Sequence, residues 1–173
     1  MLLDLRGFRS GADEIDRQYP SEAFPLEGEE FRVVAPVRLT ARVVKDAEKV
    51  RLVGRVQTQL EATCGRCLEP FPIPVDAPFD LLFLPEADVR PASGENEVQD
   101  DDIGVSFYTD DVIDLGGVMR EQFFLALPMK PLCRDDCQGL CPVCGGNRNR
   151  ERCACRTEWV DPRLAPLKKL LDS

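Results

Sequence analysis

The stretch CRDDCQGLCPVCGGNRNRERCAC, residues 133–155, holds six of the eight cysteines in this 173-residue chain. Within it, Cys141 and Cys144 are separated by two residues and precede Gly145, where the chain must turn sharply. Cys153 and Cys155 form a second pair within hairpin reach of the first. Tetrahedral zinc takes four ligands, and cysteine sulfurs bind it at about 2.3 Å. These four cysteines therefore form one candidate metal site.

The two remaining cysteines of the stretch, Cys133 and Cys137, need partners from elsewhere in the chain. The obvious candidates are Cys64 and Cys67, which form another C-x-x-C turn about 65 residues upstream. Spacing alone does not fix this pairing. Because a site whose ligands are all cysteines leaves no position open for a substrate, we expect two structural zinc ions per chain, held by all eight cysteines.

Three other interpretations of the cysteines compete with zinc. Eight cysteines can form four disulfides in a secreted domain, but C-x-x-C turns are poor geometry for mutual bridges and the chain is long enough to bury a core. The C-x-x-C turn also occurs in thioredoxin-like redox proteins, although no βαβ pattern surrounds Cys64. Four thiolates can equally hold an iron–sulfur cluster. Ligand type and spacing favour zinc over these alternatives.

Charge is distributed unevenly along the chain. Residues 1–129 carry 13 basic and 25 acidic side chains, whereas residues 130–173 carry 9 basic and 6 acidic ones, for a total net charge of −9. The cysteine-rich end is therefore the only region with a basic bias, although two zinc ions with four thiolates each would formally offset it.

The chain contains no histidine, which removes the commonest general base near neutral pH and the usual ligand of catalytic zinc. It also shows no Ser/His/Asp set, no phosphate-binding glycine motif and no distinctive carboxylate pair. We therefore expect a protein that is not an enzyme. No apolar stretch approaches the length of about 18 residues that a membrane span needs, and the early Asp4 is atypical of a secretory signal. These features predict a cytoplasmic protein.

Two alternating segments predict the centre of the body. In residues 32–44 and 50–62, apolar and polar side chains alternate with the period of a half-buried strand. Residues 46–49 form a plausible turn between them, which predicts an antiparallel hairpin. Its outer face is solvated in the simplest interpretation and binds nucleic acid in an alternative one; the basic residues on it are Arg38, Arg42, Arg51 and Arg55.

The flanking segments give weaker signals. Residues 2–5 predict an early strand, followed mostly by loop up to residue 30. Residues 71–75 and 79–84 are apolar, but five prolines between positions 70 and 85 restrict them to edge strands or extended connections. Residues 103–108 predict a short strand. The low hydrophobicity and like charges of residues 85–102 predict a disordered acidic loop.

One helix is clearly predicted before the cysteine-rich stretch. Asp114 is a good N-cap, and Pro128 ends the helix. Its apolar face comprises Leu115, Val118, Met119, Phe123 and Ala126, and we interpret Phe123, Phe124 and Leu125 as core packing.

A second short helix is expected after Asp161 and Pro162. The predicted fold class is α+β. A β-rich acidic body of antiparallel strands with one or two helices covers residues 1–130, and a cysteine-rich, zinc-ribbon-like module with a C-terminal helix covers residues 131–173.

Several segments together resemble one protein family. Residues 64–70, CGRCLEP, resemble the C-x-R-C-L-x-P signature of the YceD family, the large ribosomal RNA subunit accumulation proteins. Arg148 departs from the pattern, since the family often has leucine there. Further matches, in the family's order, are the helix segment 114–128, PLC at 131–133, CQGLCPVCG at 137–145, residues 147–149 and DPRLAPL at 161–167.

This resemblance implies a bacterial or plastid protein linked to the synthesis, processing or stability of 23S ribosomal RNA. No enzymatic activity is established for the family. Some members keep the first C-x-x-C turn and only a reduced set of the later cysteines. The resemblance therefore implies one site formed by Cys64, Cys67, Cys133 and Cys137, and an added local site formed by the other four cysteines.

The sequence and the resemblance together predict a non-enzymatic factor for 23S ribosomal RNA accumulation and large-subunit assembly, with structural zinc. Its expected partner is ribosomal RNA or an assembly intermediate, with no membrane and no small-molecule substrate. One alternative is a chaperone or interaction module whose acidic body binds a basic ribosomal protein; another is a thiol redox or zinc-buffering protein. The candidate RNA-binding residues are Arg148, Arg150, Arg152, Arg156, Lys168 and Lys169.

Overall fold

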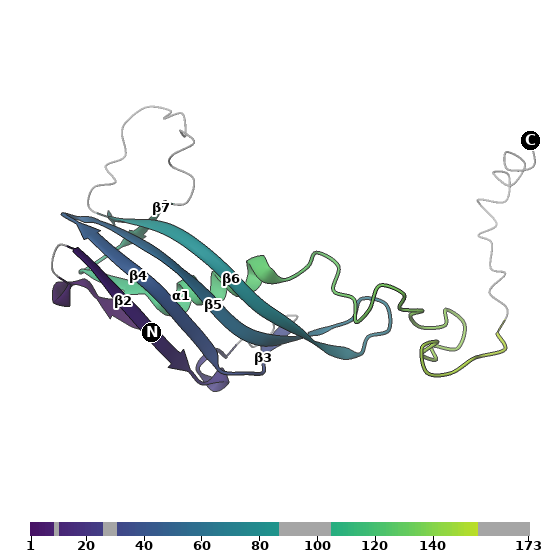
Figure 1. The fold of residues 1–173 in the computed structure, drawn as a ribbon. Helices are drawn as coiled ribbons and strands as arrows, with labels where there is room; N and C mark the ends of the chain where they lie inside the picture. Colours follow the sequence, from purple (N-terminus) through teal and green to yellow (C-terminus); the bar gives the residue numbers. More distant parts are fainter. Residues whose placement is uncertain (9–10, 26–30, 87–104, 156–173) are drawn as a thin grey trace, which may run out of the picture.

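A long sheet, antiparallel except for the parallel pairing of its last strand, is the main feature of the fold (Figure 1). The computed structural model describes residues 1–8, 11–25, 31–86 and 105–155. Within these residues the sheet has six strands, in the order β2-β4-β5-β6-β7, with β3 paired to β5. The strands are β2 (Gly11–Tyr19), β3 (Phe31–Val33), β4 (Val37–Asp46), β5 (Lys49–Thr63), β6 (Pro70–Pro85) and β7 (Val105–Tyr108).

The remaining elements are short apart from one helix. Strand β1 (Leu2–Asp4) pairs antiparallel with β8 (Val112–Asp114) to form a separate two-stranded sheet. The 3-10 helices η1 (Leu5–Gly7) and η2 (Ser21–Ala23) lie between strands, and helix α1 (Leu115–Ala126) follows β8 directly. The described part of the chain is therefore β-rich with a single α-helix, as the sequence predicts.

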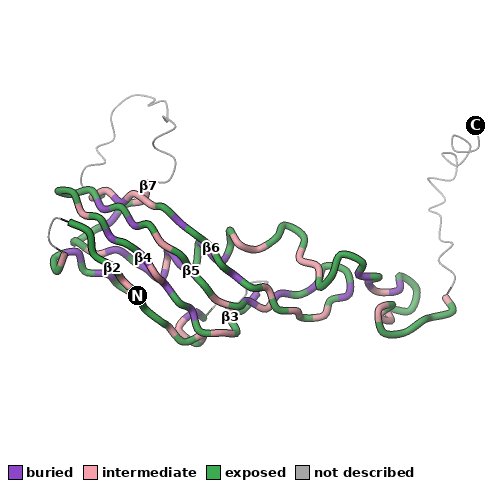
Figure 2. The backbone as a smooth tube through the Cα atoms, viewed as in Figure 1, coloured by how far each residue is buried: buried purple, intermediate pink, exposed green. Residues whose placement is uncertain are grey.

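The predicted central hairpin is confirmed, except that residues 32 and 33 belong to the separate strand β3. Strand β4 pairs with β5 from Arg38↔Gln57 to Asp46↔Lys49. Inward-facing residues of β4 are buried and alternate with exposed ones, which Figure 2 shows as alternating colours along the strands. The turn between the strands places Ala47 in the left-handed region, with φ of 52°.

Strand β2 contradicts the expectation of loop between residues 5 and 30. It pairs with β4 along its whole length, from Gly11↔Lys45 to Tyr19↔Val37. Most of its side chains are exposed on both faces, and only Ile15 and Tyr19 are half-buried. A strand that buries so little shows no hydrophobic alternation. Pairing with β4, which the local sequence does not reveal, determines its structure.

Strand β6 joins the two apolar segments that were expected separately. It pairs with β5 from Pro70 to Phe83 and with β7, in parallel, only from Leu82 to Pro85. The prolines at positions 70, 72, 74 and 78 all have the same parity. Their nitrogens therefore face one edge of the strand, and the residues between them keep N–H donors for β5. Before Leu82, the structure describes no strand on the proline-bearing edge, so the edge-strand prediction holds there.

Helix α1 begins and ends where the sequence predicts. The Asp114 side chain accepts a hydrogen bond of 2.9 Å from the Gly116 N–H and caps the first turn. Phe123 is fully buried, as expected. The expectation of core packing is wrong for Phe124 and Leu125, which are 44% and 77% exposed. Successive helical residues point about 100° apart, so neighbours of a buried residue turn away from the core.

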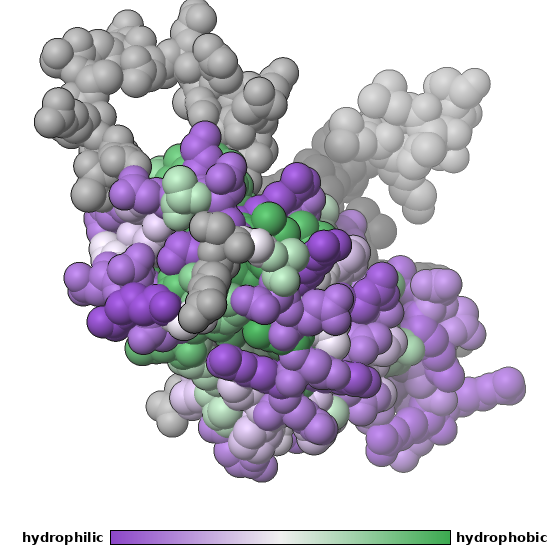
Figure 3. Space-filling model, turned by 60° about the vertical axis from the view of Figure 1, so that its left-hand side comes forward, coloured by the Kyte–Doolittle hydropathy of each residue, from purple (hydrophilic) through white to green (hydrophobic). Residues whose placement is uncertain are grey.

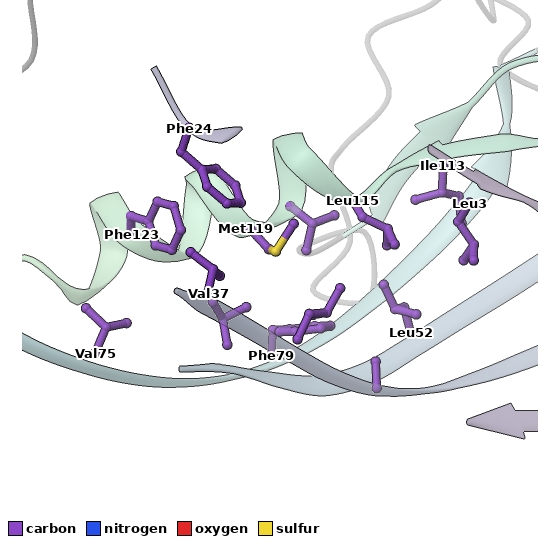
Figure 4. Packing of buried hydrophobic residues seen from close by; sticks show 14 of the residues in the cluster. Leu3, Phe24, Val37, Leu52, Val75, Phe79, Ile113, Leu115, Met119 and Phe123 are labelled. Carbon is purple, nitrogen blue, oxygen red and sulfur yellow. The ribbon is translucent and has the colours of Figure 1, made fainter. Parts of the chain in front are cut away.

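The core lies between one face of the long sheet and a layer formed by α1, β1 and β8 (Figure 4). In Figure 4, Phe123 and Met119 of the helix point toward Val37 of β4 and Phe79 of β6, while Phe24 packs beside Phe123. The Phe24 and Phe123 rings meet edge to face, with centroids 5.3 Å apart. One helix and one small sheet thus cover the sheet's inner face.

The opposite face of the sheet carries ion pairs between neighbouring strands. Arg38 contacts Asp16 at 2.8 Å, Arg51 contacts Asp80 at 2.6 Å and Arg55 contacts Asp76 at 2.7 Å. These hydrogen bonds lower the pKa of Asp16 and Asp80. Three of the four predicted outer-face arginines are therefore paired with carboxylates, which supports the solvated interpretation of this face. In the view of Figure 3, hydrophilic side chains surround a smaller central area of hydrophobic ones.

Some sequence expectations fall outside the described residues. Residues 87–102 of the predicted acidic loop and the predicted C-terminal helix lie there. Pro85 belongs to β6 rather than to that loop. The domain boundary at residues 130–131 stays a prediction. Among the described residues, no helix has the length and apolar character needed to cross a membrane.

Replacing Gly54 with alanine is expected to destabilise the sheet. A Cβ atom at this position of β5 would lie 2.6 Å from the Ala41 Cβ and would also overlap the Thr40 carbonyl oxygen. Strand backbone would have to move, and such overpacking typically costs about 1–3 kcal/mol. Urea unfolding measures the loss. Gly7→Ala is the control, because a Cβ there meets nothing within 4 Å; equal stability of both variants would contradict this packing.

Candidate metal centres

The first cysteine cluster joins two segments that are far apart in the sequence. Cys64 and Cys67 lie at the tip of the hairpin between β5 and β6, and Cys133 and Cys137 follow helix α1. All four Sγ atoms lie within 4.8 Å of one another. This is the grouping that the resemblance implies. We call it the hairpin cluster.

The sulfur spacing of the hairpin cluster fits a tetrahedral metal. The Cys64 and Cys137 Sγ atoms are 3.8 Å apart, and those of Cys67 and Cys133 are 3.7 Å apart. A tetrahedron with metal–sulfur bonds of about 2.3 Å has sulfur–sulfur edges of about 3.8 Å. All eight cysteines of the chain are free in the structure. The donor set and its spacing therefore fit zinc or a similar thiophilic ion.

Backbone hydrogen bonds shape the hairpin tip. The Cys64 N–H donates to the Glu69 carbonyl at 2.9 Å, and the Leu68 N–H donates to the Cys64 carbonyl at 2.9 Å. Leu68 adopts a left-handed conformation, with φ of 60°. The Gly65 N–H donates to the Pro131 carbonyl at 2.8 Å. The last bond joins the tip to the segment that carries the other two ligands.

Arg66, between the two cysteines of the tip, fastens it to the module. Its Nη1 atom donates to the carbonyls of Asp135 and Cys137, both at 3.0 Å. Its own carbonyl accepts from the Leu140 N–H at 3.1 Å. Gly139 passes close by with φ of 68°, and a Cβ there would lie 3.0 Å from the Arg66 carbonyl oxygen. The sequence contained Arg66 within a motif, but gave it no role.

The second cluster is local. The Sγ atoms of Cys141, Cys144, Cys153 and Cys155 also lie within 4.8 Å of one another. The Gly145 N–H donates to the Cys141 carbonyl at 2.8 Å, and the left-handed conformation of Gly145 makes the predicted sharp turn. We call this group the knuckle cluster. Both predicted groups of four cysteines are thus brought together.

The two clusters differ in exposure. Cys64, Cys67 and Cys137 of the hairpin cluster are buried beside Phe71 and Leu132. In the knuckle cluster, Cys141 is buried but Cys144 and Cys153 are exposed. Figure 2 shows the module with few buried positions, extending from the end of the sheet. A metal in the knuckle cluster would therefore be the more accessible to chelators.

Neighbouring groups separate the pKa values within the hairpin cluster. Burial raises the pKa of Cys64, but hydrogen bonds from the backbone N–H groups of Cys67 and Cys133 outweigh it and lower the pKa to about 6. Burial and the adjacent Cys137 sulfur raise the pKa of Cys133 to about 12. Without a cation, the cluster therefore combines a thiolate with a thiol that keeps its proton.

The pKa values of the knuckle cluster are separated in the same way. Hydrogen bonds from the backbone N–H groups of Cys144 and Val143 lower the pKa of Cys141 to about 6. A hydrogen bond with Cys144 raises the pKa of Cys155 to about 12. A cation that binds all four sulfurs must displace the protons that remain.

Arginines gather around a cleft beside the clusters. The cleft has a volume of about 600 Å³. Four arginines line it together with one acidic residue, two amides and one cysteine: Arg134, Arg148, Arg150, Arg152, Glu151, Gln138, Asn149 and Cys153. Arg150 pairs with Glu69 at 2.8 Å, and Arg134 pairs with Asp136 at 3.4 Å. Three predicted RNA-binding residues thus share one cleft with Arg134, which the sequence did not single out. Arg156, Lys168 and Lys169 lie outside the described residues.

The chain matches the family model described as "Large ribosomal RNA subunit accumulation protein YceD" over residues 52–171. An uncharacterized protein of Mycobacterium tuberculosis is 35% identical over 133 residues, which cover 77% of this chain and 61% of that protein. The chain therefore spans about three fifths of the length of this relative.

Two further relatives come from maize and Bacillus subtilis. The maize protein "Large ribosomal RNA subunit accumulation protein YCED homolog 1, chloroplastic" is 29% identical over 155 residues, covering 77% of this chain and 53% of the maize protein. The uncharacterized protein YlbN of Bacillus subtilis is 27% identical over 143 residues, covering 82% of this chain and 78% of YlbN. No solved structure matches the chain.

Replacing Arg66 with alanine is expected to loosen the module from the hairpin tip. The change removes two hydrogen bonds from a charged donor, which lowers the stability of the contact by roughly 1–3 kcal/mol. Faster hydrogen exchange at the Leu140 N–H, which bonds to the Arg66 carbonyl, would report it. Arg32→Ala is the control, because it breaks only an exposed pair with Glu61. Equal exchange in both variants would show that Arg66 does not fasten the module.

Metal binding is expected to weaken as the pH falls. Cys133 and Cys155, with pKa values of about 12, keep their protons at neutral pH, so each bound ion releases at least one proton. Affinity then falls roughly tenfold per pH unit for each proton released. Calorimetry in buffers of different ionisation enthalpy counts those protons. An affinity that stays constant on acidification from neutral pH would be inconsistent with thiol ligands.

Proposed function

This chain belongs to the YceD family of large ribosomal RNA subunit accumulation proteins, and we propose that it is a non-enzymatic factor in the accumulation of 23S ribosomal RNA and in assembly of the large ribosomal subunit. Two structural zinc ions hold its module in place, and the arginine cleft contacts RNA. The observation that supports this most is the position of that cleft, where four arginines gather beside the two cysteine clusters.

Zinc is the metal that the donor set favours. Cysteine thiolates select zinc, copper(I) or iron–sulfur clusters, and four sulfurs at tetrahedral spacing suit a closed structural zinc site. Cys64, Cys67, Cys133 and Cys137 would hold one ion, and the knuckle cluster the other. Structural zinc contributes about 10–16 kcal/mol in small modules. Each ion would supply a fixed crosslink and no chemistry.

The described part of the module is not a general basic surface. Residues 131–155 contain four arginines and three acidic residues. Two ions, each with four thiolates, would add formal negative charge. The positive charge is therefore useful only where the arginines lie together, at the cleft. Arginine forms two parallel hydrogen bonds to phosphate. The cleft therefore suits direct contacts with phosphates of the RNA backbone.

A basic ribosomal protein is the second candidate partner. Glu48, Glu86, Asp110 and Asp111 line another cleft of about 460 Å³. It lies where β5 begins and β6 ends, whereas the hairpin cluster lies at the other end of these strands. Strand β5 would separate the two clefts by about 50 Å, given a rise of about 3.3 Å per residue. In this alternative the acidic end, and not the arginine cleft, makes the contact.

Replacing Arg148 and Arg152 together with alanine distinguishes these partners. RNA binding through the cleft would lose two phosphate contacts. The plot of log affinity for a 23S ribosomal RNA fragment against log salt concentration would then become shallower, its slope changing by about 1.4–1.8. Filter binding at several salt concentrations measures this. The control is Arg51→Ala with Arg55→Ala, which removes the same charge from the ion-paired sheet face. Unchanged RNA binding in the first variant, with metal content intact, would favour the protein partner.

A further inference from the structure

Asn149 belongs to the knuckle loop but reaches the hairpin cluster. It lies between Cys144 and Cys153, two ligands of the knuckle cluster. Its Nδ2 atom donates to the Cys137 Sγ atom at a distance of 3.3 Å. A sulfur of one cluster is thus hydrogen-bonded by a side chain whose position depends on the other cluster.

The surrounding groups fix the orientation of the Asn149 amide. Its Oδ1 atom accepts from the Gln138 N–H at 2.8 Å and from Arg134 Nη2 at 2.7 Å. The Asn147 Oδ1 atom accepts from both the Asn149 N–H and its Nδ2, each at 2.9 Å. Donors surround the oxygen and acceptors surround the nitrogen, so a flipped amide would lose its partners.

The backbone of the knuckle loop is tied to the hairpin segment as well. Leu140 and Asn147 form an isolated antiparallel bridge, and the Arg148 N–H donates to the Gly139 carbonyl at 2.9 Å. These contacts hold the loop against the segment that links Cys137 to Cys141. The two clusters are therefore parts of one bonded unit.

We propose that Asn149 is a positioning residue that couples the two metal centres, so that occupancy of the knuckle centre tightens metal binding at the hairpin centre. This coupling rests on the structural metal of the proposed function. A metal held by Cys144 and Cys153 fixes both ends of the knuckle loop, and the loop then presents the Asn149 Nδ2 atom to the Cys137 sulfur. Hydrogen bonds of this kind to a metal ligand typically change affinity by about 10- to 100-fold.

Linkage makes the effect reciprocal. If a metal in the knuckle centre raises the affinity of the hairpin centre, a metal in the hairpin centre raises that of the knuckle centre by the same factor. The exposed knuckle centre would exchange its metal first, and its loss would weaken the buried one. Because Arg134 donates to the same amide and lines the arginine cleft, metal occupancy would also set the position of one cleft arginine.

Cobalt titration of the full chain tests this coupling. Co²⁺ is added to reduced, metal-free protein, and its sulfur charge-transfer band reports binding. Asn149→Ala removes the donor, and Asn149→Asp keeps an oxygen for Gln138 and Arg134 but turns a carboxylate oxygen toward the sulfur. The control is Gln138→Ala, whose side chain donates to the Asp136 carbonyl and whose backbone N–H remains.

Asn149→Ala is expected to weaken Co²⁺ binding at the hairpin centre about 10- to 100-fold, and Asn149→Asp to weaken it further. Both should shift the energy of the charge-transfer band, which general loosening of the fold would not do. Gln138→Ala should leave affinity and band unchanged. These readouts keep the test valid even where one variant reduces overall stability.

Removing the knuckle centre completes the test. Cys144→Ser with Cys153→Ser leaves the hairpin centre alone, and its affinity should fall by the coupling factor. Adding Asn149→Ala to that background should cause little further loss, since the loop is no longer held. The coupling would be overturned if the affinity losses from Asn149→Ala and from the double cysteine variant simply added. It would also be overturned if both Asn149 variants kept the affinity and the band of the wild type. Either result would leave the metal centres themselves intact. Absence of any sulfur–cobalt band in the wild type would instead overturn the proposed structural metal.

Discussion

The arrangement of the chain depends on four sulfurs that would repel one another as thiolates. Cys64 and Cys67 come from a hairpin tip and Cys133 and Cys137 from beyond the helix, yet their Sγ atoms lie within 4.8 Å. Bringing four negative charges this close is unfavourable without a cation. Without a cation, burial and the Cys137 sulfur raise the pKa of Cys133 to about 12, so that this thiol keeps its proton. Despite burial, backbone N–H groups meanwhile lower the pKa of Cys64 to about 6. A divalent ion would remove this conflict.

The sheet supplies a rigid support for that cluster. Strands β5 and β6 pair without a break from Val50↔Phe83 to Thr63↔Pro70. This continuous ladder ends at the turn that carries Cys64 and Cys67 and holds the turn in place. The inner face of the sheet packs on α1, and the helix then delivers the chain to the second pair. Arg66 and Gly65 add bonds that join the tip to the module, and Asn149 extends the network to the knuckle cluster.

Sequence reasoning succeeded where a local pattern and its physical cause coincide. The central hairpin shows strict alternation, helix α1 has a clear cap at Asp114, and the cysteine pairs have recognisable spacings. It failed where structure depends on distant partners. Strand β2 is specified by pairing with β4, and the exposure of Phe124 and Leu125 follows from which helical face meets the sheet. The roles of Arg66 and Asn149 could not be predicted, because hydrogen bonds to carbonyls and a sulfur across the fold leave no signature in nearby residues.

The metal content of the chain, measured with its free-thiol count on protein purified without added metal, tests the central claim most directly. The two clusters predict two zinc ions per chain and thiols that react with a thiol reagent only after chelation. That result would establish both four-cysteine centres. Protein without metal whose cysteines are oxidised to disulfides would contradict the account, because the sulfur tetrahedra would then have no cation to hold them.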